Sequence, residues 1–202
     1  MKNAKFKPLV LLTALMNVAS FNTGWTESIE HKFKDAIDNV AETLKEGVDK
    51  LGEDKEAIQN YLNNYSWKGI IQDHASSGPA TLKDLKMNGH HKVVVVDTCD
   101  TIECEVMCNL DRSKCAAFSV YRVVLGIKDL GAQTTIGNEF GIVAGESREK
   151  FTLHAPRKPG LYQVRFKPVE SLLERTALES WTDEHGEEPD ASTTIGIILV
   201  RE

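Results

Sequence analysis

The stretch Thr101-Ile-Glu-Cys-Glu-Val-Met-Cys-Asn-Leu110 alternates apolar and polar residues over most of its length. Successive side chains of a β-strand point to opposite faces, so Ile102, Cys104 and Val106 would share one buried face. The pattern therefore predicts a half-buried strand. Just upstream, Lys92-Val-Val-Val-Val96 predicts a second strand, because β-branched residues favour extended backbone.

Further short strands are expected along the rest of the chain, with turn residues between them. They are Ala116–Ile127, with Phe118, Val120, Val123 and Leu125 as core, Gln133–Ile136, Gly141–Ala144, Lys150–His154, Leu161–Phe166 and Thr194–Val200. Many short strands predict an all-β sandwich or barrel. One helix is expected to interrupt them over Pro168–Trp181, since proline suits a first helical position. Its narrow apolar face would cover one end or edge of the sandwich and comprises Leu172, Leu173, Thr176, Ala177 and Trp181.

The stretch Ala155-Pro-Arg-Lys-Pro-Gly-Leu-Tyr-Gln-Val-Arg-Phe166 resembles the late strand of immunoglobulin-like sandwiches. In that family a tyrosine hydroxyl bonds back to the preceding corner, and Tyr162 matches this tyrosine-corner position. The turn Asp97-Thr-Cys-Asp-Thr-Ile-Glu-Cys104 resembles the hairpin that joins the family's first two strands. Val164 stands where antibody domains carry a second cysteine, so the resemblance is to secreted bacterial domains of immunoglobulin-like architecture. It covers residues 82–201 and implies no reaction.

The first residues have the layout of a secretory signal peptide. Three lysines precede a mostly apolar run, Pro8–Ser20, which ends in the small residues Val18-Ala-Ser20. The run is too short to cross a bilayer as a helix. We therefore expect residues 1–20 to direct export and the protein to be secreted or periplasmic. Removing them would change the net charge from −6 to −9, because they hold three lysines and no acidic residue.

Residues 28–51 are predicted to form a long amphipathic helix. The apolar stripe consists of Ile29, Phe33, Ile37, Val40, Leu44, Val48 and Leu51. These spacings average about 3.67 residues per turn, the period of an eleven-residue repeat. The helix could pack on its own domain, form a coiled coil that makes a homo-oligomer, or lie on a membrane. Ten acidic residues against five lysines over residues 27–56 count against a lipid surface.

A second helical stretch is expected over Asp54–Tyr65 and could form a hairpin with the first. Ser76-Ser-Gly-Pro79 has the composition of a turn and is taken as the domain boundary. The predicted organisation is α+β overall. It consists of a signal peptide (1–20), a helical region (21–75), a linker (76–81) and an all-β immunoglobulin-like sandwich with one inserted helix (82–202).

Four cysteines in an exported chain predict disulfides. Local pairing would join Cys99 to Cys104 and Cys108 to Cys115, each across a short loop. The alternatives are Cys99 with Cys108 and Cys104 with Cys115, or free thiols. The cysteine spacings do not match paired zinc knuckles, and adjacent His90 and His91 would point to opposite faces of a strand. We therefore expect no metal site.

The sequence contains no nucleophile elbow, phosphate loop or dinucleotide fingerprint, so no catalytic residues and no cofactors are predicted. An acidic chain also argues against nucleic-acid binding. The leading hypothesis is an exported, non-enzymatic binding or structural protein whose sandwich contacts a protein or glycan, with Trp181 and Phe140 as candidate contacts. One alternative is a secreted hydrolase with Asp, Glu and His at the sandwich end. The other is a membrane-surface or coiled-coil assembly protein that acts through residues 28–51.

Overall fold

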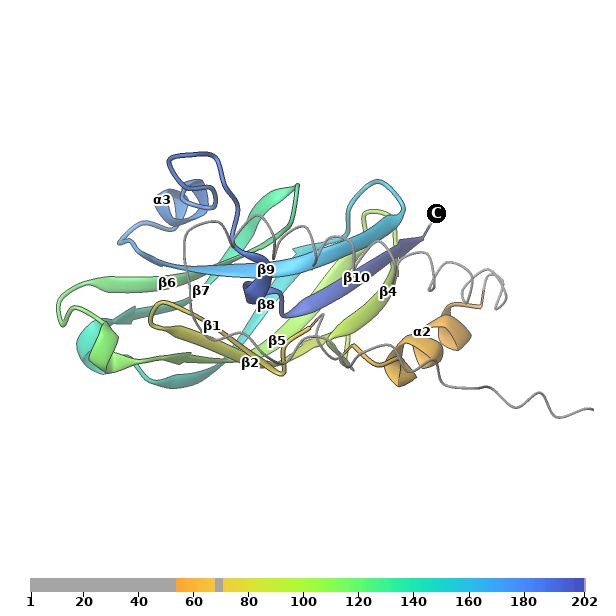
Figure 1. The fold of residues 1–202 in the computed structure, drawn as a ribbon, viewed down its shortest axis with the longest axis horizontal. Coiled ribbons are helices and arrows are strands. Elements are labelled where there is room, and N and C mark those ends of the chain that lie inside the picture. The colour runs from red at the N-terminus through yellow and green to blue at the C-terminus, as the bar shows by residue number, and fades with distance from the viewer. Residues whose placement is uncertain (1–53, 68–70, 202) are drawn as a thin grey trace, which may run out of the picture.

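The computed structural model describes residues 54–67 and 71–201, which form a β-sandwich of two five-stranded sheets (Figure 1). The first sheet contains β1 (His74–Ser77), β2 (Ala80–Met87), β5 (Thr101–Leu110) and β8 (Glu146–His154) in that order, with β3 (His90–His91) paired to β2. The second sheet has the order β4 (Val93–Asp97), β10 (Gly196–Arg201), β9 (Gly160–Glu170), β6 (Val120–Ile127) and β7 (Gly131–Phe140). Two helices flank them, α2 (Lys55–Asn64) and α3 (Glu174–Glu179).

The main core lies between the two sheets, and β5 supplies one side of it as the alternation predicts. Ile102, Cys104 and Val106 are buried, while the residues between them face outward on the first sheet. The second sheet contributes side chains such as Leu125 and Phe166 to the same cluster. The strand over 101–110 is therefore confirmed, together with the face that it buries.

Strand β4 is buried on both of its faces, which explains its unbroken run of valines. It pairs in parallel with β10, in the register Val93 to Ile197, whereas the other paired strands run antiparallel. Val94 and Val96 point into the main core, and the alternate residues Val93 and Val95 point toward α2. A strand covered on both sides has no polar face, so the pattern is continuous rather than alternating.

Helix α2 covers the outer face of the second sheet at β4 and β10 (Figure 1). Asp54 caps its first turn by accepting hydrogen bonds from the backbone N–H groups of Glu56 and Ala57, at 3.0 and 3.1 Å. Ile58 and Leu62, one turn apart, are buried against the valines of β4. The helix predicted over residues 54–65 is therefore confirmed. No helix among the described residues is long and apolar enough to cross a membrane.

Two glutamine side chains occupy strand edges. The amide of Gln59 in α2 donates to the carbonyl of Val93 at 3.1 Å and accepts from the N–H of Val95 at 2.8 Å. The amide of Gln133 in β7 does the same for both backbone groups of His154 in β8, at 3.1 and 2.7 Å. Each side chain makes the hydrogen bonds that a neighbouring strand would make at that edge. Because unpaired edge groups are templates for aggregation, the two glutamines protect these edges.

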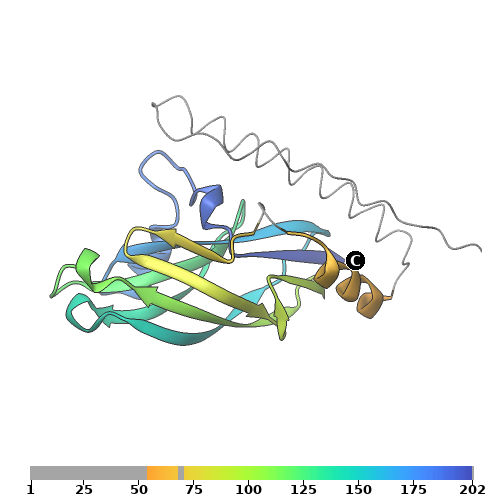
Figure 2. The ribbon, with the colours of Figure 1, turned by 60° about the horizontal axis from the view of Figure 1, so that its bottom comes forward.

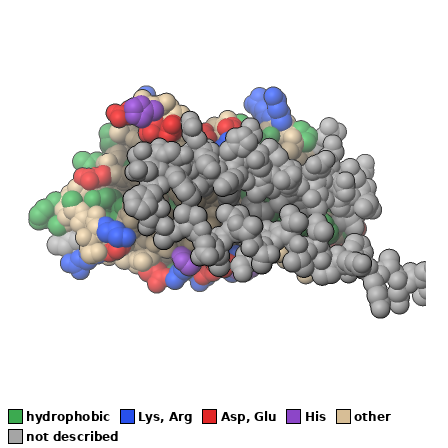
Figure 3. All heavy atoms as spheres, in the orientation of Figure 1, with side chains coloured by type: hydrophobic (Ala, Val, Ile, Leu, Met, Phe, Trp, Pro, Cys, Tyr) green, Lys and Arg blue, Asp and Glu red, His purple; other side chains and the backbone are tan. Residues whose placement is uncertain are grey.

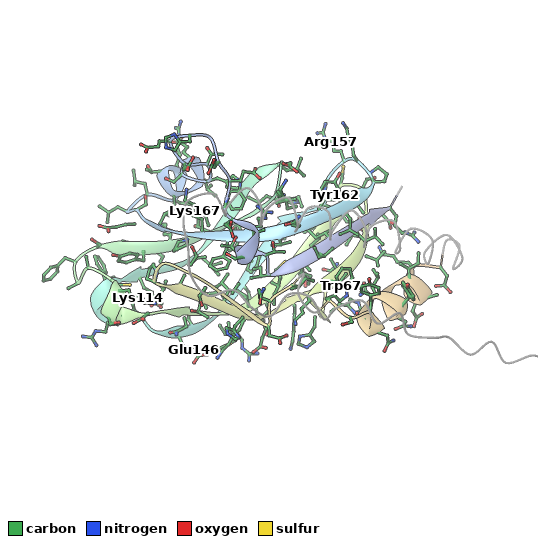
Figure 4. The ribbon with its side chains drawn as sticks, in the orientation of Figure 1. Trp67, Lys114, Glu146, Arg157, Tyr162 and Lys167 are labelled. Atoms are coloured by element: carbon green, nitrogen blue, oxygen red, sulfur yellow. The ribbon has the colours of Figure 1, made fainter. Side chains whose placement is uncertain are left out.

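The hydroxyl of Tyr162 donates to the backbone carbonyl of Lys158, four residues earlier, at 2.8 Å. This is the contact that defines a tyrosine corner. Figure 4 shows Tyr162 near the start of β9, below the loop that carries Arg157. The bond fixes the corner from which β9 runs through the centre of the second sheet.

The segment expected to be a linker is part of the sandwich. Ser76 and Ser77 belong to β1, Gly78 and Pro79 form the turn, and β2 begins at Ala80 (Figure 2). The turn chemistry was interpreted correctly, since Gly78 has a φ of +50°. The error was to expect a domain boundary where the chain makes a hairpin, so the sandwich begins before residue 82.

Three local predictions in the second half of the chain were wrong. Phe118 is exposed rather than core, because β6 begins only at Val120. Residues 141–143 form a 3₁₀ turn rather than a strand. Pro168 lies within β9, opposite Val123 of β6, rather than at the start of a helix. Proline is tolerated there because β10 pairs with β9 only as far as Val164, which leaves that side of Pro168 without a strand partner.

Helix α3 is shorter than expected and covers the outer face of the second sheet near β6. Ala177 and Trp181 are buried against Val124, which points outward from that sheet. Leu172 and Leu173, expected on the same buried face, precede the helix and are exposed. The predicted signal peptide (1–20), the apolar stripe of residues 29–51 and the coiled coil lie outside the described residues.

Candidate binding surface

Several large apolar side chains are exposed to solvent at one end of the sandwich. Six large hydrophobic residues are exposed among those described, and five of them come from loops or a strand end on this side. We call these five the tip surface: Phe118 (89% exposed), Phe140 (53%), Val143 (66%), Leu172 (72%) and Leu173 (67%). Their loops lie at the left end in Figure 1, and Figure 3 shows hydrophobic atoms projecting there. The sixth, Leu130, lies in the turn between β6 and β7.

Backbone hydrogen bonds hold the three loops of the tip surface together at the start of β6. The N–H of Gly141 donates to the carbonyl of Ser119 at 2.9 Å, and the N–H of Ser171 donates to the carbonyl of Val120 at 2.9 Å. Val120 also pairs with Phe140 in the β6–β7 ladder. Residues adjacent to Phe118, Phe140 and Leu172 are therefore joined directly, which places the three side chains at the same end.

A cluster of three polar side chains, Tyr121, Glu170 and Ser119, joins the loops to the ends of the strands that carry them. The hydroxyl of Tyr121 accepts from the N–H of Ala116 at 2.9 Å and donates to Glu170 at 3.4 Å. The same carboxylate accepts from the hydroxyl of Ser119. These bonds join the loop after β5 to the end of β9, so the backbone beneath Phe118 is fixed from two sides.

Gly141 is required for the close approach of two tip loops. A Cβ atom at this position would lie 2.2 Å from the carbonyl oxygen of Ala116 and 2.8 Å from the Cβ of Cys115. Both neighbours are parts of the chain that cannot rotate away. The loop after β7 can therefore pack on the loop after β5 only because position 141 has no side chain.

Charged residues of both signs surround the tip surface, and they lie on different loops. Arg112 and Lys114 are exposed in the loop after β5, where Lys114 also lies 3.5 Å from Asp111. Figure 4 places Lys114 at the left end of the molecule. Glu139 lies at the end of β7, and Glu174, in the first turn of α3, accepts from Thr135 at 3.3 Å. Charges of both signs therefore occur on each side, because Asp111 pairs with Lys114 and the exposed Arg175 follows Glu174.

The outer face of the first sheet carries a shallow groove of about 190 Å³. It is lined by Asp84, Lys86, His91, Glu105, Val106, Met107 and Arg148. Glu105 accepts a 3.0 Å ion-paired hydrogen bond from Arg148. A β-bulge in β2 opens the groove, and Asp84 has a φ of +57° within it. Of the charged residues that line the groove, Glu105 and Arg148 are paired with each other.

The two residues proposed from sequence as binding contacts have different environments. Trp181 is 4% exposed, and its indole N–H donates to Glu188 at 3.1 Å, so its surface is not available to a ligand. Phe140 is half exposed and belongs to the tip surface. Trp181 therefore packs α3 onto the sheet, and Phe140 remains a candidate contact.

No disulfide is present among the described residues, and all four cysteines are free thiols, which was one of the three alternatives. Cys104 and Cys108 lie on the same face of β5, four residues apart, which separates their Cα atoms by about 13 Å. Cys99 is exposed in the turn before β5, whereas Cys104 points into the core. Burial raises the pKa of both Cys104 and Cys108 to about 12, so these thiols stay protonated near neutral pH.

The histidines proposed for a hydrolase lie on separate elements. His90 is in β3, His154 ends β8, and His185 is in the loop after α3. His185 lies 3.5 Å from Glu184, its neighbour in the chain. Within residues 54–67 and 71–201, no three His, Cys, Asp or Glu side chains are arranged to hold a metal ion. The hydrolase hypothesis thus gains no support from the geometry.

Sequence reasoning assigned most of the tip surface to the interior. Phe118 was expected to be core and Leu172 and Leu173 were expected to face a sheet. One signal could have corrected the first error, because Ser113-Lys-Cys-Ala-Ala-Phe-Ser119 has no alternation and follows a turn. For the two leucines the chain offers no comparable signal.

The two packed sheets and the tip surface define a β-sandwich protein with an exposed apolar loop end. No protein-family model matches the chain, and no curated protein matches it. Among solved structures it is similar to the CARDB domain of the PF1109 protein from Pyrococcus furiosus, in complex with di-metal ions. The two are 13% identical, the match covers 64% of this chain and 96% of that one, and the TM-score is 0.27. A similarity of this degree carries no conclusion about function.

Proposed function

We propose that this chain is an exported, non-enzymatic binding protein whose β-sandwich contacts a partner protein through the tip surface. The observation that carries the proposal is the concentration of exposed apolar side chains on loops that are held in place by hydrogen bonds. Monomeric proteins rarely expose large contiguous apolar patches, and such patches rimmed by polar residues mark interaction sites.

The size of the tip surface supports a protein as the partner. A fully exposed aromatic side chain presents roughly 200 Å² and an aliphatic one roughly 150 Å², so the five residues expose about 600 Å² of apolar surface. That is at the upper end of the largest patch on a typical monomer, about 300 to 600 Å². A standard protein interface buries about 800 Å² on each partner, so the patch can form the centre of one.

The strand order supports an immunoglobulin-like assignment of the sandwich. The first sheet places β2, β5 and β8 side by side, and the second places β9 between β10 and β6. The tyrosine corner at Tyr162 lies near the start of β9, a late strand, as it does in that family. Loops clustered at the end of such a sandwich are a common place for recognition. The signal-like composition of residues 1–20 supports the proposal of export.

Binding by the tip surface can be tested with a matched pair of variants. Phe118→Ser with Leu172→Ser removes two of its most exposed side chains, and Leu130→Ser removes the one exposed large hydrophobic residue located elsewhere among those described. The native chain and both variants would be cross-linked to extracellular or envelope proteins from the source cells. A partner captured by the native chain and by Leu130→Ser, but not by the double variant, supports the proposal. Equal capture by all three overturns it.

A further inference from the structure

We infer that residues 44–51 pack as a helix on the side of α2 that faces β10 and β9, where they complete an apolar cluster that the described residues leave open. Of the three environments named for the apolar stripe of residues 29–51, this one is the surface of the chain's own sandwich. The contact lies on the second sheet and is independent of the tip surface, so it goes beyond the proposed function.

The apolar cluster between α2 and the second sheet has a buried centre and an incomplete margin (Figure 1). At its centre, α2 and the strands beneath it are buried. We call its half-buried members the α2 margin, which consists of Tyr61, Tyr65, Leu161 and Leu199. Two of them come from α2 and two from the sheet, so a segment lying between the helix and β9 would contact both pairs.

One row of residues across the second sheet shows where the cover of α2 ends. Leu199 of β10 pairs with Val95 of β4 on one side and with Leu161 of β9 on the other. Val95 is 3% exposed beneath α2, whereas Leu199 and Leu161, farther from the helix, are half-buried. In the neighbouring row β9 is covered, since the hydroxyl of Thr194 donates to Gln163 at 3.1 Å. The open part of the row therefore lies beside α2, over Leu199 and Leu161.

The aromatic residues of α2 point toward this open part of the sheet. Gln59 makes both of its backbone hydrogen bonds to the free edge of β4, and Lys55, one turn earlier, lies 3.2 Å from Asp97. Successive residues of a helix are about 100° apart, so Tyr61, two positions after Gln59, lies on the opposite side of α2. Tyr65 follows Tyr61 by one turn. The polar contacts thus occupy the β4 edge, and the aromatic side faces β10 and β9.

The solvent side of α2 is polar. Glu56, Asn60 and Asn64 are exposed and follow one another at four-residue spacing. A neighbouring helix with an apolar face would gain no apolar contact there, nor at the edge of β4, where Gln59 and Lys55 lie. The side with Tyr61 and Tyr65 is the one on which an apolar stripe would be buried.

The chain connection brings residues 44–51 to α2. The helix begins at Lys55 after its cap at Asp54, so only residues 52 and 53 separate that cap from Leu51. Helices joined by so short a loop lie side by side and antiparallel. Gly52 suits the turn, because glycine commonly follows the last residue of a helix. The segment next to α2 is therefore the end of the stripe itself.

The spacing of the stripe fits the α2 margin. Leu44, Val48 and Leu51 are four and three residues apart, so they share one face of a helix. Counting outward from residue 53 in an antiparallel hairpin, Leu44 lies level with Tyr61, and Val48 lies nearer the turn, over Leu199. The three side chains would leave water together with the margin that they cover.

A pair of introduced cysteines tests this placement in the full chain. Cys99→Ser with Cys115→Ser removes the two thiols that are not buried, and Leu44→Cys with Tyr61→Cys is added to that background. A short bifunctional maleimide should join the pair within one chain, with a yield that does not depend on protein concentration. Leu44→Cys with Asn63→Cys is the matched control and should cross-link about tenfold less, because Asn63 lies level with Tyr61 on the other side of α2.

Hydrogen exchange provides a second readout that needs no new cysteine. A short helix is marginal in water, so amides of residues 44–51 that exchange about 100-fold more slowly than in an unfolded peptide report packing. Val48→Asp places a charge against Leu199 and should abolish this protection. Asn39→Asp adds the same charge away from the stripe and should retain it. Unchanged exchange of β5 in both variants shows that the sandwich stays folded.

Three results would overturn the inference. Cross-links that join two chains assign the stripe to a coiled coil between copies. Equal yields from the two cysteine pairs, or no cross-link in either, show that residues 44–51 do not occupy the Tyr61 side of α2. Protection of residues 44–51 only in the presence of phosphatidylglycerol vesicles assigns them to a membrane surface. Each of these results leaves the proposed function of the tip surface unchanged.

Discussion

Replacement of Gln59 by leucine should destabilise the sandwich well beyond the usual effect of a single amide. The side chain is 6% exposed and makes two hydrogen bonds to the edge of β4, to the carbonyl of Val93 and from the N–H of Val95. Leucine fills a similar volume but leaves both backbone groups buried and unpaired. An unsatisfied buried group costs about 1 to 3 kcal/mol, so the two together should cost about 2 to 4 kcal/mol after the gain in apolar burial.

The measurement is unfolding by urea and by heat, followed by tryptophan fluorescence. For a chain of this size, 1 kcal/mol changes Tm by about 2 to 4 °C, so a loss of about 2 to 4 kcal/mol in Gln59→Leu should lower Tm by about 4 to 16 °C. Gln72→Leu is the matched control, because Gln72 is exposed and the same substitution there should leave stability within about 0.5 kcal/mol.

A second variant separates the hydrogen bonds from packing. Gln59→Glu at neutral pH can accept from Val95 but cannot donate to Val93, so it should also be destabilised. Protonation at low pH restores a donor, and the deficit relative to the native chain should shrink as the pH falls. If Gln59→Leu is as stable as the native chain, the edge of β4 does not depend on this side chain and the reasoning fails.

Three further outcomes follow from contacts in the sandwich. Lys55, and after it Arg201, hold the pKa of Asp97 below its usual value, so this stabilisation is present above about pH 4 and is lost as the pH falls through the lowered pKa. Asp97→Asn should therefore cost less than about 1 kcal/mol at pH 7, since the pair is partly exposed, and should flatten the acid limb of the stability curve. A thiol reagent at pH 8 should leave Cys104 unmodified until urea unfolds the chain, and labelling of the native protein at this site would contradict its burial. Gly141→Ala should destabilise the chain by more than about 2 kcal/mol, and an unchanged free energy of unfolding would show that the loops are not tightly packed.

Hydrophobic periodicity predicted the elements whose faces are buried without interruption. Strand β5 alternates over its length because one side meets the core and the other meets solvent. Helix α2 repeats its apolar residues at helical spacing because a single face rests on β4. In both cases the environment of each residue follows from its position in the element, so one sequence is enough.

The β1–β2 hairpin was missed because its pattern is broken in the middle. Leu82, Leu85 and Met87 all point inward, and the spacing between the first two is three residues rather than two. The extra residue forms the bulge at Asp84, which shifts the alternation by one position. Without knowledge of the bulge, the segment has no period, and its serines and glycine dominate its composition.

The tip surface could not be predicted because periodicity does not report which end of a strand leaves the sandwich. Phe118 lies two residues before the start of β6, where the pattern of the strand still appears to continue. Pro168 appeared to start a helix because the sequence does not show that β10 stops pairing at Val164. Both errors concern where strand pairing begins or stops, which is a property of the tertiary structure.

During synthesis, β4 emerges long before β10, the strand with which it pairs in parallel. Asp97 and Arg201, at the last position of this register, are 104 residues apart in the chain. At about 5 to 20 residues per second, the valine-rich strand emerges several seconds before the strand that pairs with it. Because α2 is made earlier than β4, Gln59 can cover one edge of the valines during that interval. A message cut short before Gly196 would release a chain without β10 and with four valines of β4 unpaired, a target for proteases and a seed for aggregates.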